Sequence, residues 1–170
     1  MKIFYIHGLE STQNSSKVDL MRSLGYDVHA EYMDYRNVSD LYEKTLNSIK
    51  DFKPFMIVGS SMGGHFAYHL GTHYKTNLIL LNPALPNRSF DPPILPDGIE
   101  KSNIWALIGK NDDVVDPVAN EKILKRVGAS IEIGNHGHRT PPEIFEPFFS
   151  SVLEDLQTLR EENWDPFSGI

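Results

Sequence analysis

The residues best suited to chemistry lie in the pentapeptide Gly59-Ser60-Ser61-Met62-Gly63. It follows the apolar run Phe55-Met56-Ile57-Val58 and precedes small residues with a helical pattern, so it predicts a strand, a sharp turn and a helix. A serine at such a turn is held in a strained backbone conformation, and the residues two before and two after it must be small. Ser61 meets this condition, whereas Ser60 has Val58 and Met62 at those positions. The pattern therefore predicts that Ser61 is the nucleophile of a serine hydrolase.

A serine hydroxyl is a poor nucleophile near neutral pH, so it needs a general base and a carboxylate that orients the base. Carboxylates come after Ser61 in the chain, directly after the apolar run Ile104 to Gly109, as Asp112, Asp113 and Asp116. Asp116 precedes a proline, and this pair is typical of a helix N-cap. Asp112 and Asp113 remain as candidates for the orienting acid.

Histidines follow the last apolar run, in Gly134-Asn135-His136-Gly137-His138. The order serine, aspartate, histidine is the one found when the three residues lie on loops after successive strands of a doubly wound sheet. The residues alone leave His136 and His138 as alternatives, since a shorter loop would favour His136.

An oxyanion hole requires backbone N–H groups aimed at the developing negative charge. One is expected from Met62, which follows the nucleophile at the start of its helix. The second is expected from the turn His7-Gly8-Leu9-Glu10 after the first strand, at the N–H of Leu9. We expect His7 to brace this turn.

Other patterns speak against a metal or cofactor. His65, His69 and His73 share one helix face, but no glutamate stands between them as in the H-E-x-x-H zinc motif. No lysine follows Gly63-Gly64, which argues against a Walker-type phosphate loop. We expect neither a metal nor a cofactor.

Composition limits the class of protein. The 170 residues suffice for one hydrophobic core, and we expect a single domain over residues 1–160 and a tail over 161–170. The formal charge of −7, without clusters of Lys or Arg, argues against nucleic acid as a partner. No apolar stretch has the length of a signal peptide core or a membrane span, so we expect a cytoplasmic protein without a membrane partner. The absence of cysteine excludes disulfides, and nothing in the sequence indicates an oligomeric state.

Short apolar runs alternate with segments of helical period, which predicts a parallel sheet with helices on both faces. Six strands are expected: Ile3 to His7, Tyr26 to Tyr32, Phe55 to Gly59, Asn77 to Leu81, Ile104 to Gly109, and Ala129 to Ile133. Five helices are expected: Ser16 to Leu24, Val38 to Lys50, Met62 to Tyr74, Val118 to Val127, and Pro142 to Leu159.

One long segment, Asn82 to Asn103, carries five prolines and no helical or strand period, so a loop is expected. Its apolar residues either line a groove beside Ser61 or pack the loop onto the domain; they are Leu85, Phe90, Ile94 and Leu95.

Four ordered motifs give the chain a family resemblance. They are Ile6-His7-Gly8-Leu9-Glu10-Ser11, Val58-Gly59-Ser60-Ser61-Met62-Gly63-Gly64, Leu81-Asn82-Pro83-Ala84, and Asp112-Asp113-Val114-Val115-Asp116. With these motifs the chain resembles the small, cap-less serine esterases of the alpha/beta-hydrolase superfamily, in particular the YqiA-like bacterial esterases. The resemblance covers most of the chain.

The resemblance implies a doubly wound six-stranded sheet of order 2-1-3-4-5-6, without a cap domain. It also implies a triad of Ser61, Asp112 and His138 that hydrolyses carboxylic or thio esters of small or acyl-chain substrates through an acyl-enzyme. Asp112 stands where the hydrolase pattern has its acid, three residues past the glycine that ends the strand, and Gly137-His138 resembles the Gly-His pair of that pattern. Two departures are Leu9, where the family usually has an aromatic, and Arg139-Thr140, which replace the aromatic after the histidine.

The same residues would serve an acyl-CoA thioesterase, a peptidase or an acyltransferase, because a triad fixes acyl-transfer chemistry and not the leaving group. A binding module that kept the fold without turnover is the alternative from another class. The expected partner is a small-molecule ester.

Overall fold

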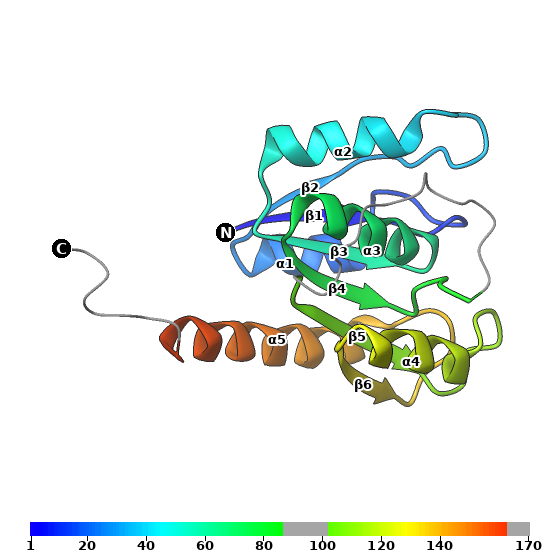
Figure 1. The fold of residues 1–170 in the computed structure, drawn as a ribbon, viewed down its shortest axis with the longest axis vertical. Helices are drawn as coiled ribbons and strands as arrows, with labels where there is room; N and C mark the ends of the chain where they lie inside the picture. Colours follow the sequence, from blue (N-terminus) through cyan, green and yellow to red (C-terminus); the bar gives the residue numbers. More distant parts are fainter. Residues whose placement is uncertain (87–101, 163–170) are drawn as a thin grey trace.

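The computed structural model describes residues 1–86 and 102–162. Its core is one parallel sheet of six strands in the order β2-β1-β3-β4-β5-β6, as predicted (Figure 1). The strands are β1 (Lys2–Ile6), β2 (Asp27–Ala30), β3 (Met56–Ser60), β4 (Asn77–Leu81), β5 (Ile104–Gly109) and β6 (Ser130–Gly134). The helices are α1 (Ser16–Ser23), α2 (Leu41–Phe52), α3 (Met62–Tyr74), α4 (Pro117–Arg126) and α5 (Pro142–Glu162).

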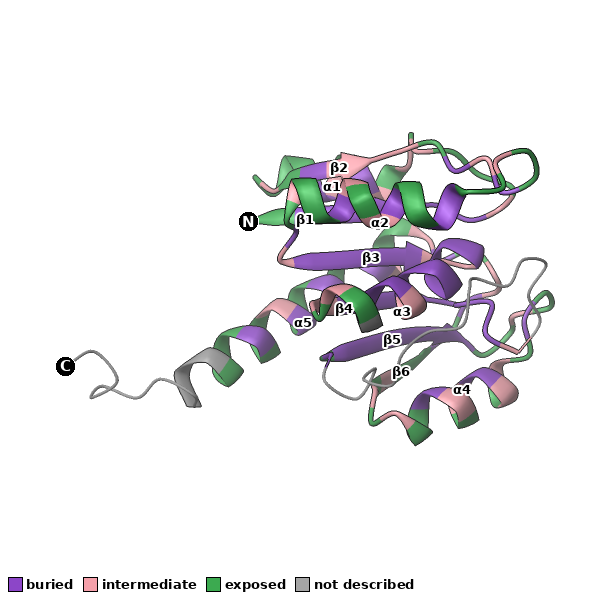
Figure 2. Ribbon diagram, turned by 45° about the horizontal axis from the view of Figure 1, so that its top comes forward, coloured by how far each residue is buried: buried purple, intermediate pink, exposed green. Residues whose placement is uncertain are grey.

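Helices cover both faces of the sheet, because alternate strand residues point to opposite faces. On one face, Phe4, Ile57 and Leu80 pack in one cluster with side chains of α2, α3 and α4. On the other face, Tyr5 and Val58 belong to a second cluster with side chains of α1 and α5. Figure 2 shows the resulting pattern, with β3, β4 and β5 largely buried and with buried and exposed residues alternating along α2 and α4.

Local signals set several element boundaries. Asp116 caps α4, since its carboxylate accepts from the N–H groups of Val118 and Ala119. Gly128, just beyond α4, has a φ of +72°, the left-handed conformation expected for a residue that ends a helix. The predicted start of α2 at Val38 was wrong by three residues, because Asp34 accepts from the N–H of Asn37 in a turn that precedes the helix.

The parallel order brings the carboxyl ends of all strands to one edge of the sheet. β1 and β3 are neighbours there, with Ile6 in register with Gly59, and Ser60 of β3 is in register with Leu81 of β4. Ser61 and the turn after β1 are therefore adjacent, which is the arrangement that creates a crevice at the switch point of a doubly wound sheet.

Parts of two sequence predictions fall outside the described residues. Phe90, Ile94 and Leu95 of the predicted loop are among them, as are residues 163–170 of the predicted tail. Leu85, the remaining apolar residue of that loop, is buried in the core cluster of α2 and α3 rather than in a groove. Among the residues that the structure describes, no helix combines the length and apolarity needed to cross a membrane.

Candidate active site

Ser61 lies at the turn between β3 and α3 with φ 55° and ψ −117°. A residue with a side chain rarely adopts this conformation, which costs roughly 1–3 kcal/mol and persists only where the surroundings enforce it. The surroundings here are three backbone hydrogen bonds: the N–H of Ser61 donates to the carbonyl of Leu81, and its carbonyl accepts from the N–H groups of His65 and Ala84. The turn is thus fastened to β4 and to the segment after it.

The glycines around Ser61 are required by contact distances, as the sequence predicted. A Cβ atom at Gly63 would lie 2.1 Å from the carbonyl oxygen of Ile6, and one at Gly59 would lie 2.4 Å from the carbonyl oxygen of Gly63. Real Cβ atoms essentially never approach other atoms closer than 3.0 Å. The close packing of α3 against β1 and β3 therefore depends on these two positions.

A continuous hydrogen-bonded chain joins Ser61, His138 and Asp112. The Nε2 atom of His138 lies 2.8 Å from Oγ of Ser61, and its Nδ1 atom lies 2.9 and 3.0 Å from the two carboxylate oxygens of Asp112. Since an ionised carboxylate only accepts, Nδ1 carries the proton and Nε2 is free to accept the serine hydroxyl proton. This is the arrangement that a general base for Ser61 requires.

The carboxylate of Asp112 is held in place from behind. Its Oδ1 atom accepts from the N–H groups of Val114 and Val115, both at 2.9 Å, and only 1% of its side chain is exposed. Asp113, the alternative acid, is exposed and makes none of these bonds.

His136, the alternative base, points elsewhere. Its Nδ1 atom lies 2.7 Å from the carbonyl oxygen of Gly137, and the residue is 7% exposed. Its Nε2 atom is buried without a hydrogen-bond partner among the described residues. The structure thus brings His138, and not His136, within hydrogen-bond distance of Ser61.

The turn after β1 is braced by His7. The Nε2 atom of His7 accepts from the N–H of Met33 at 2.8 Å, so Nδ1 carries the proton and donates to the carbonyl of Gly8 at 2.7 Å. Tyr35 donates its hydroxyl to the carbonyl of His7 at 2.5 Å. Burial lowers the pKa of His7 below the usual value of 6.5, which keeps the ring neutral. The N–H of Met33 thus finds an acceptor on a ring that stays neutral at physiological pH.

This turn lies directly against the serine. A Cβ atom at Gly8 would be 3.1 Å from Cβ of Ser61. Leu9 and Met62, the two residues expected to supply oxyanion N–H groups, both line the same cavity as Ser61. Met62 is also the first residue of α3, where backbone N–H groups have no acceptor within the helix.

Asn82 is a site residue to which sequence reasoning gave no role. It is fully buried directly after β4, with a φ of +42°. Its Nδ2 atom donates to the carbonyls of His138 (2.7 Å) and Gly137 (3.1 Å), and its Oδ1 atom accepts from the N–H of Gly109 at 2.6 Å. One side chain therefore ties the loop that carries His138 to the end of β5, from which Asp112 follows. The signal in the sequence was a polar residue directly after an apolar strand. Asparagine is mostly exposed in proteins, so a buried asparagine at such a place needs hydrogen-bond partners.

A cavity of about 890 Å³ opens over Ser61 and His138. This volume is in the range of small-molecule sites. Hydroxyl and amide side chains of the loop between β1 and α1 line one part of it, including Ser11, Thr12 and Asn14. Apolar side chains line another part, including Leu9, Met62 and Val115. Across residues 1–86 and 102–162, no three His, Cys, Asp or Glu side chains come together as metal ligands.

Comparison with protein families places the chain. The model of an uncharacterised protein family, UPF0227, matches residues 2–97, which is more than half of the sequence. The chain belongs to this family. The match confirms the resemblance to YqiA-like proteins that the four motifs indicated. No curated protein is similar enough in sequence to this UPF0227 member to count as a match.

Solved structures show the fold of this UPF0227 chain. A protein of Xanthomonas campestris pv. campestris, described as a putative hydrolase of the alpha/beta superfamily, superposes with a TM-score of 0.75 at 18% identity, over 91% of this chain and 97% of that one. An esterase of Pyrococcus furiosus superposes with a TM-score of 0.71 at 15% identity, over 92% of this chain and 81% of the esterase. Est1E of Butyrivibrio proteoclasticus superposes with a TM-score of 0.67 at 15% identity, over 93% of this chain and 88% of Est1E. The predicted alpha/beta-hydrolase fold is confirmed.

Proposed function

We propose that this protein is a serine hydrolase that cleaves carboxylic esters or thioesters through an acyl-enzyme. The observation that carries the proposal is the hydrogen-bonded chain from Asp112 through His138 to Ser61, with the serine on a strained turn at the mouth of a cavity. The esterases among the structural neighbours support it, since they share the fold.

In the first half of the reaction, the Oγ atom of Ser61 attacks the ester carbonyl carbon while Nε2 of His138 takes the hydroxyl proton. The imidazolium ion that forms is stabilised by Asp112, and the N–H groups of Leu9 and Met62 bind the oxyanion. The carbon–oxygen bond to the alcohol then breaks, and His138 gives its proton to the departing oxygen. Ser61 is left as an acyl ester.

In the second half, water attacks the acyl carbon and gives a proton to Nε2 of His138. The bond between the acyl carbon and Oγ breaks, the proton returns to Ser61, and the carboxylic acid leaves. The fixed turn at Ser61 suits both halves, because it keeps the Oγ atom in one position throughout.

Turnover of p-nitrophenyl acetate tests the proposal. Ser61→Ala and His138→Gln should each lower kcat by roughly 10⁴-fold or more, as losses of a member of such a unit do. Ser150→Ala, at an exposed serine on α5 whose hydroxyl donates to the carbonyl of Glu146, is the matched control and should retain full activity. Full activity in Ser61→Ala would refute the proposal, and loss in His136→Gln but not in His138→Gln would reverse the assignment of the base.

A further inference from the structure

One wall of the cavity carries a lysine without a counter-charge. Lys17, in the first turn of α1, lines the cavity together with Ser61 and His138. No carboxylate of the described residues lies within 4 Å of its ammonium group. By contrast, the surface lysines Lys44 and Lys125 are paired with Asp40 at 2.9 Å and with Glu121 at 2.6 Å.

The environment of Lys17 disfavours its charge. The residue is only partly exposed, and burial lowers the pKa of its ammonium group below the usual value. Withdrawing a cation from water without a partner costs free energy, so an unpaired cation in a cavity wall calls for an explanation. The chain has 23 Asp and Glu residues against 16 Lys and Arg, so acidic partners are not scarce.

The other charges that line the cavity leave Lys17 available. Glu10 is bound by Arg36 at 2.5 Å. Arg139, directly after His138, is exposed and has no ion-pair partner in the described part of the chain. Asp113 is the remaining acidic residue of the lining, and it is also exposed. The lining of the cavity thus contains two cations without an ion-pair partner and one free carboxylate.

We infer that the cavity takes an ester carrying a negative charge, and that Lys17 binds this charge while Ser61 attacks the carbonyl, with Arg139 as a second cation. The inference rests on the proposed hydrolase function and narrows its substrate class. The charged group takes no part in bond making: the ester bond breaks as described above, and the anion remains on the acid or on the alcohol that leaves. The hydroxyl and amide groups beside Lys17 suit the same polar portion of the substrate.

The test compares pairs of esters of similar size, in which one member carries a carboxylate where the other carries a neutral group. For a charge on the acyl side, the p-nitrophenyl monoester of adipic acid is compared with p-nitrophenyl hexanoate. For a charge on the alcohol side, 4-acetoxybenzoate is compared with its methyl ester. In each pair the ratio of kcat/KM, anionic over neutral, is measured for the natural sequence, for Lys17→Gln and for Lys50→Gln.

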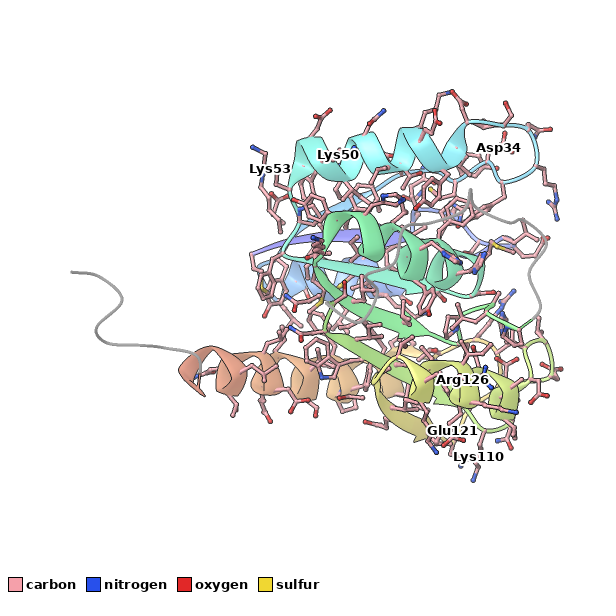
Figure 3. The ribbon with its side chains drawn as sticks, in the orientation of Figure 1. Asp34, Lys50, Lys53, Lys110, Glu121 and Arg126 are labelled. Carbon is pink, nitrogen blue, oxygen red and sulfur yellow. The ribbon has the colours of Figure 1, made fainter. Side chains whose placement is uncertain are left out.

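We expect Lys17→Gln to lower this ratio roughly tenfold in one of the two pairs, the size of a hydrogen bond to a charged group. The pair that responds shows which side of the ester bears the charge. Lys50→Gln removes the same charge from the far end of α2, where Figure 3 shows Lys50 and Lys53 projecting from the edge opposite the carboxyl ends of the strands, and it should leave both ratios unchanged.

Ratios that stay unchanged in Lys17→Gln for both pairs would overturn the inference, while hydrolysis of the neutral esters would leave the proposed function standing. A protein that hydrolyses none of the four esters would instead refute the proposed function itself.

Discussion

Asn82 offers the most specific prediction about how the site is held together. Asn82→Asp keeps the size of the side chain and the acceptor for the N–H of Gly109, but it replaces the donor of two hydrogen bonds with an oxygen. The carbonyl oxygens of Gly137 and His138 now lie 3.1 and 2.7 Å from Nδ2. In the variant they would face a carboxylate oxygen at about the same distances. Both lost bonds start from a fully buried side chain and end on carbonyls of partly buried residues.

The expected cost follows from these two bonds. A buried acceptor left unsatisfied costs about 1–3 kcal/mol, and these two carbonyls are partly buried, so Asn82→Asp should lower the free energy of unfolding by about 2–4 kcal/mol in total. This is a large part of the roughly 5–15 kcal/mol of a typical domain. Because the freed segment carries His138, the variant that remains folded should also lose kcat, by roughly 10² if the imidazole moves by about 1 Å.

Urea unfolding followed by circular dichroism measures the free energy of unfolding. Hydrolysis of p-nitrophenyl acetate, at a temperature where the variant is folded, measures kcat. Asn103→Asp is the matched control: it makes the same chemical change at an exposed amide that donates to Oδ1 of Asn77 at 3.0 Å, and should shift stability by less than about 1 kcal/mol. Equal stability of the two variants, or an unchanged kcat in folded Asn82→Asp, would refute the role assigned to Asn82.

Gly63→Ala should prevent stable folding, since its Cβ would lie 2.1 Å from a backbone oxygen. Gly128→Ala has open space and only a positive φ to accommodate, so it should lower the free energy of unfolding by about 1 kcal/mol. Thermal melts of both variants check this. Stability should fall as the pH drops below 6.5, because His7 takes up a proton there in the unfolded chain, whereas burial lowers the pKa of the folded ring and keeps it neutral. Urea midpoints measured at several pH values should decline less steeply in His7→Gln than in the natural sequence. An identical decline would contradict the role of His7. Asp112→Asn should lower kcat by roughly 10⁴ with little change in the fold, measured with p-nitrophenyl acetate and circular dichroism, and a loss of less than tenfold would contradict its orienting role.

The sequence predicted the fold well because its signals are local. The bounds of β4, β5 and α3 agree with the prediction, since each is an apolar run or helical segment with clear flanks. The position of Ser61 could be predicted for the same reason, because the two glycines that the turn requires, Gly59 and Gly63, lie within the same five residues.

The remainder of the site depends on contacts between distant segments. Whether His136 or His138 reaches Ser61 is decided by the path of a loop whose end is tied down by Asn82, 56 residues earlier in the chain. The bond from Asn82 to Gly109 spans 27 residues. Spacing and composition do not encode such partners, so Asn82 could be noticed in the sequence but its role could not be derived from it.

The most direct test of the central claim is covalent labelling of the active serine with a fluorophosphonate, read by intact mass and peptide mapping. If His138 and Asp112 activate Ser61, the protein should take up one equivalent of probe, and the label should map to Ser61. Labelling should vanish in Ser61→Ala and persist in Ser150→Ala. Folded protein that takes up no probe, or a label that maps to another residue, would contradict the assignment of Ser61 as an activated nucleophile.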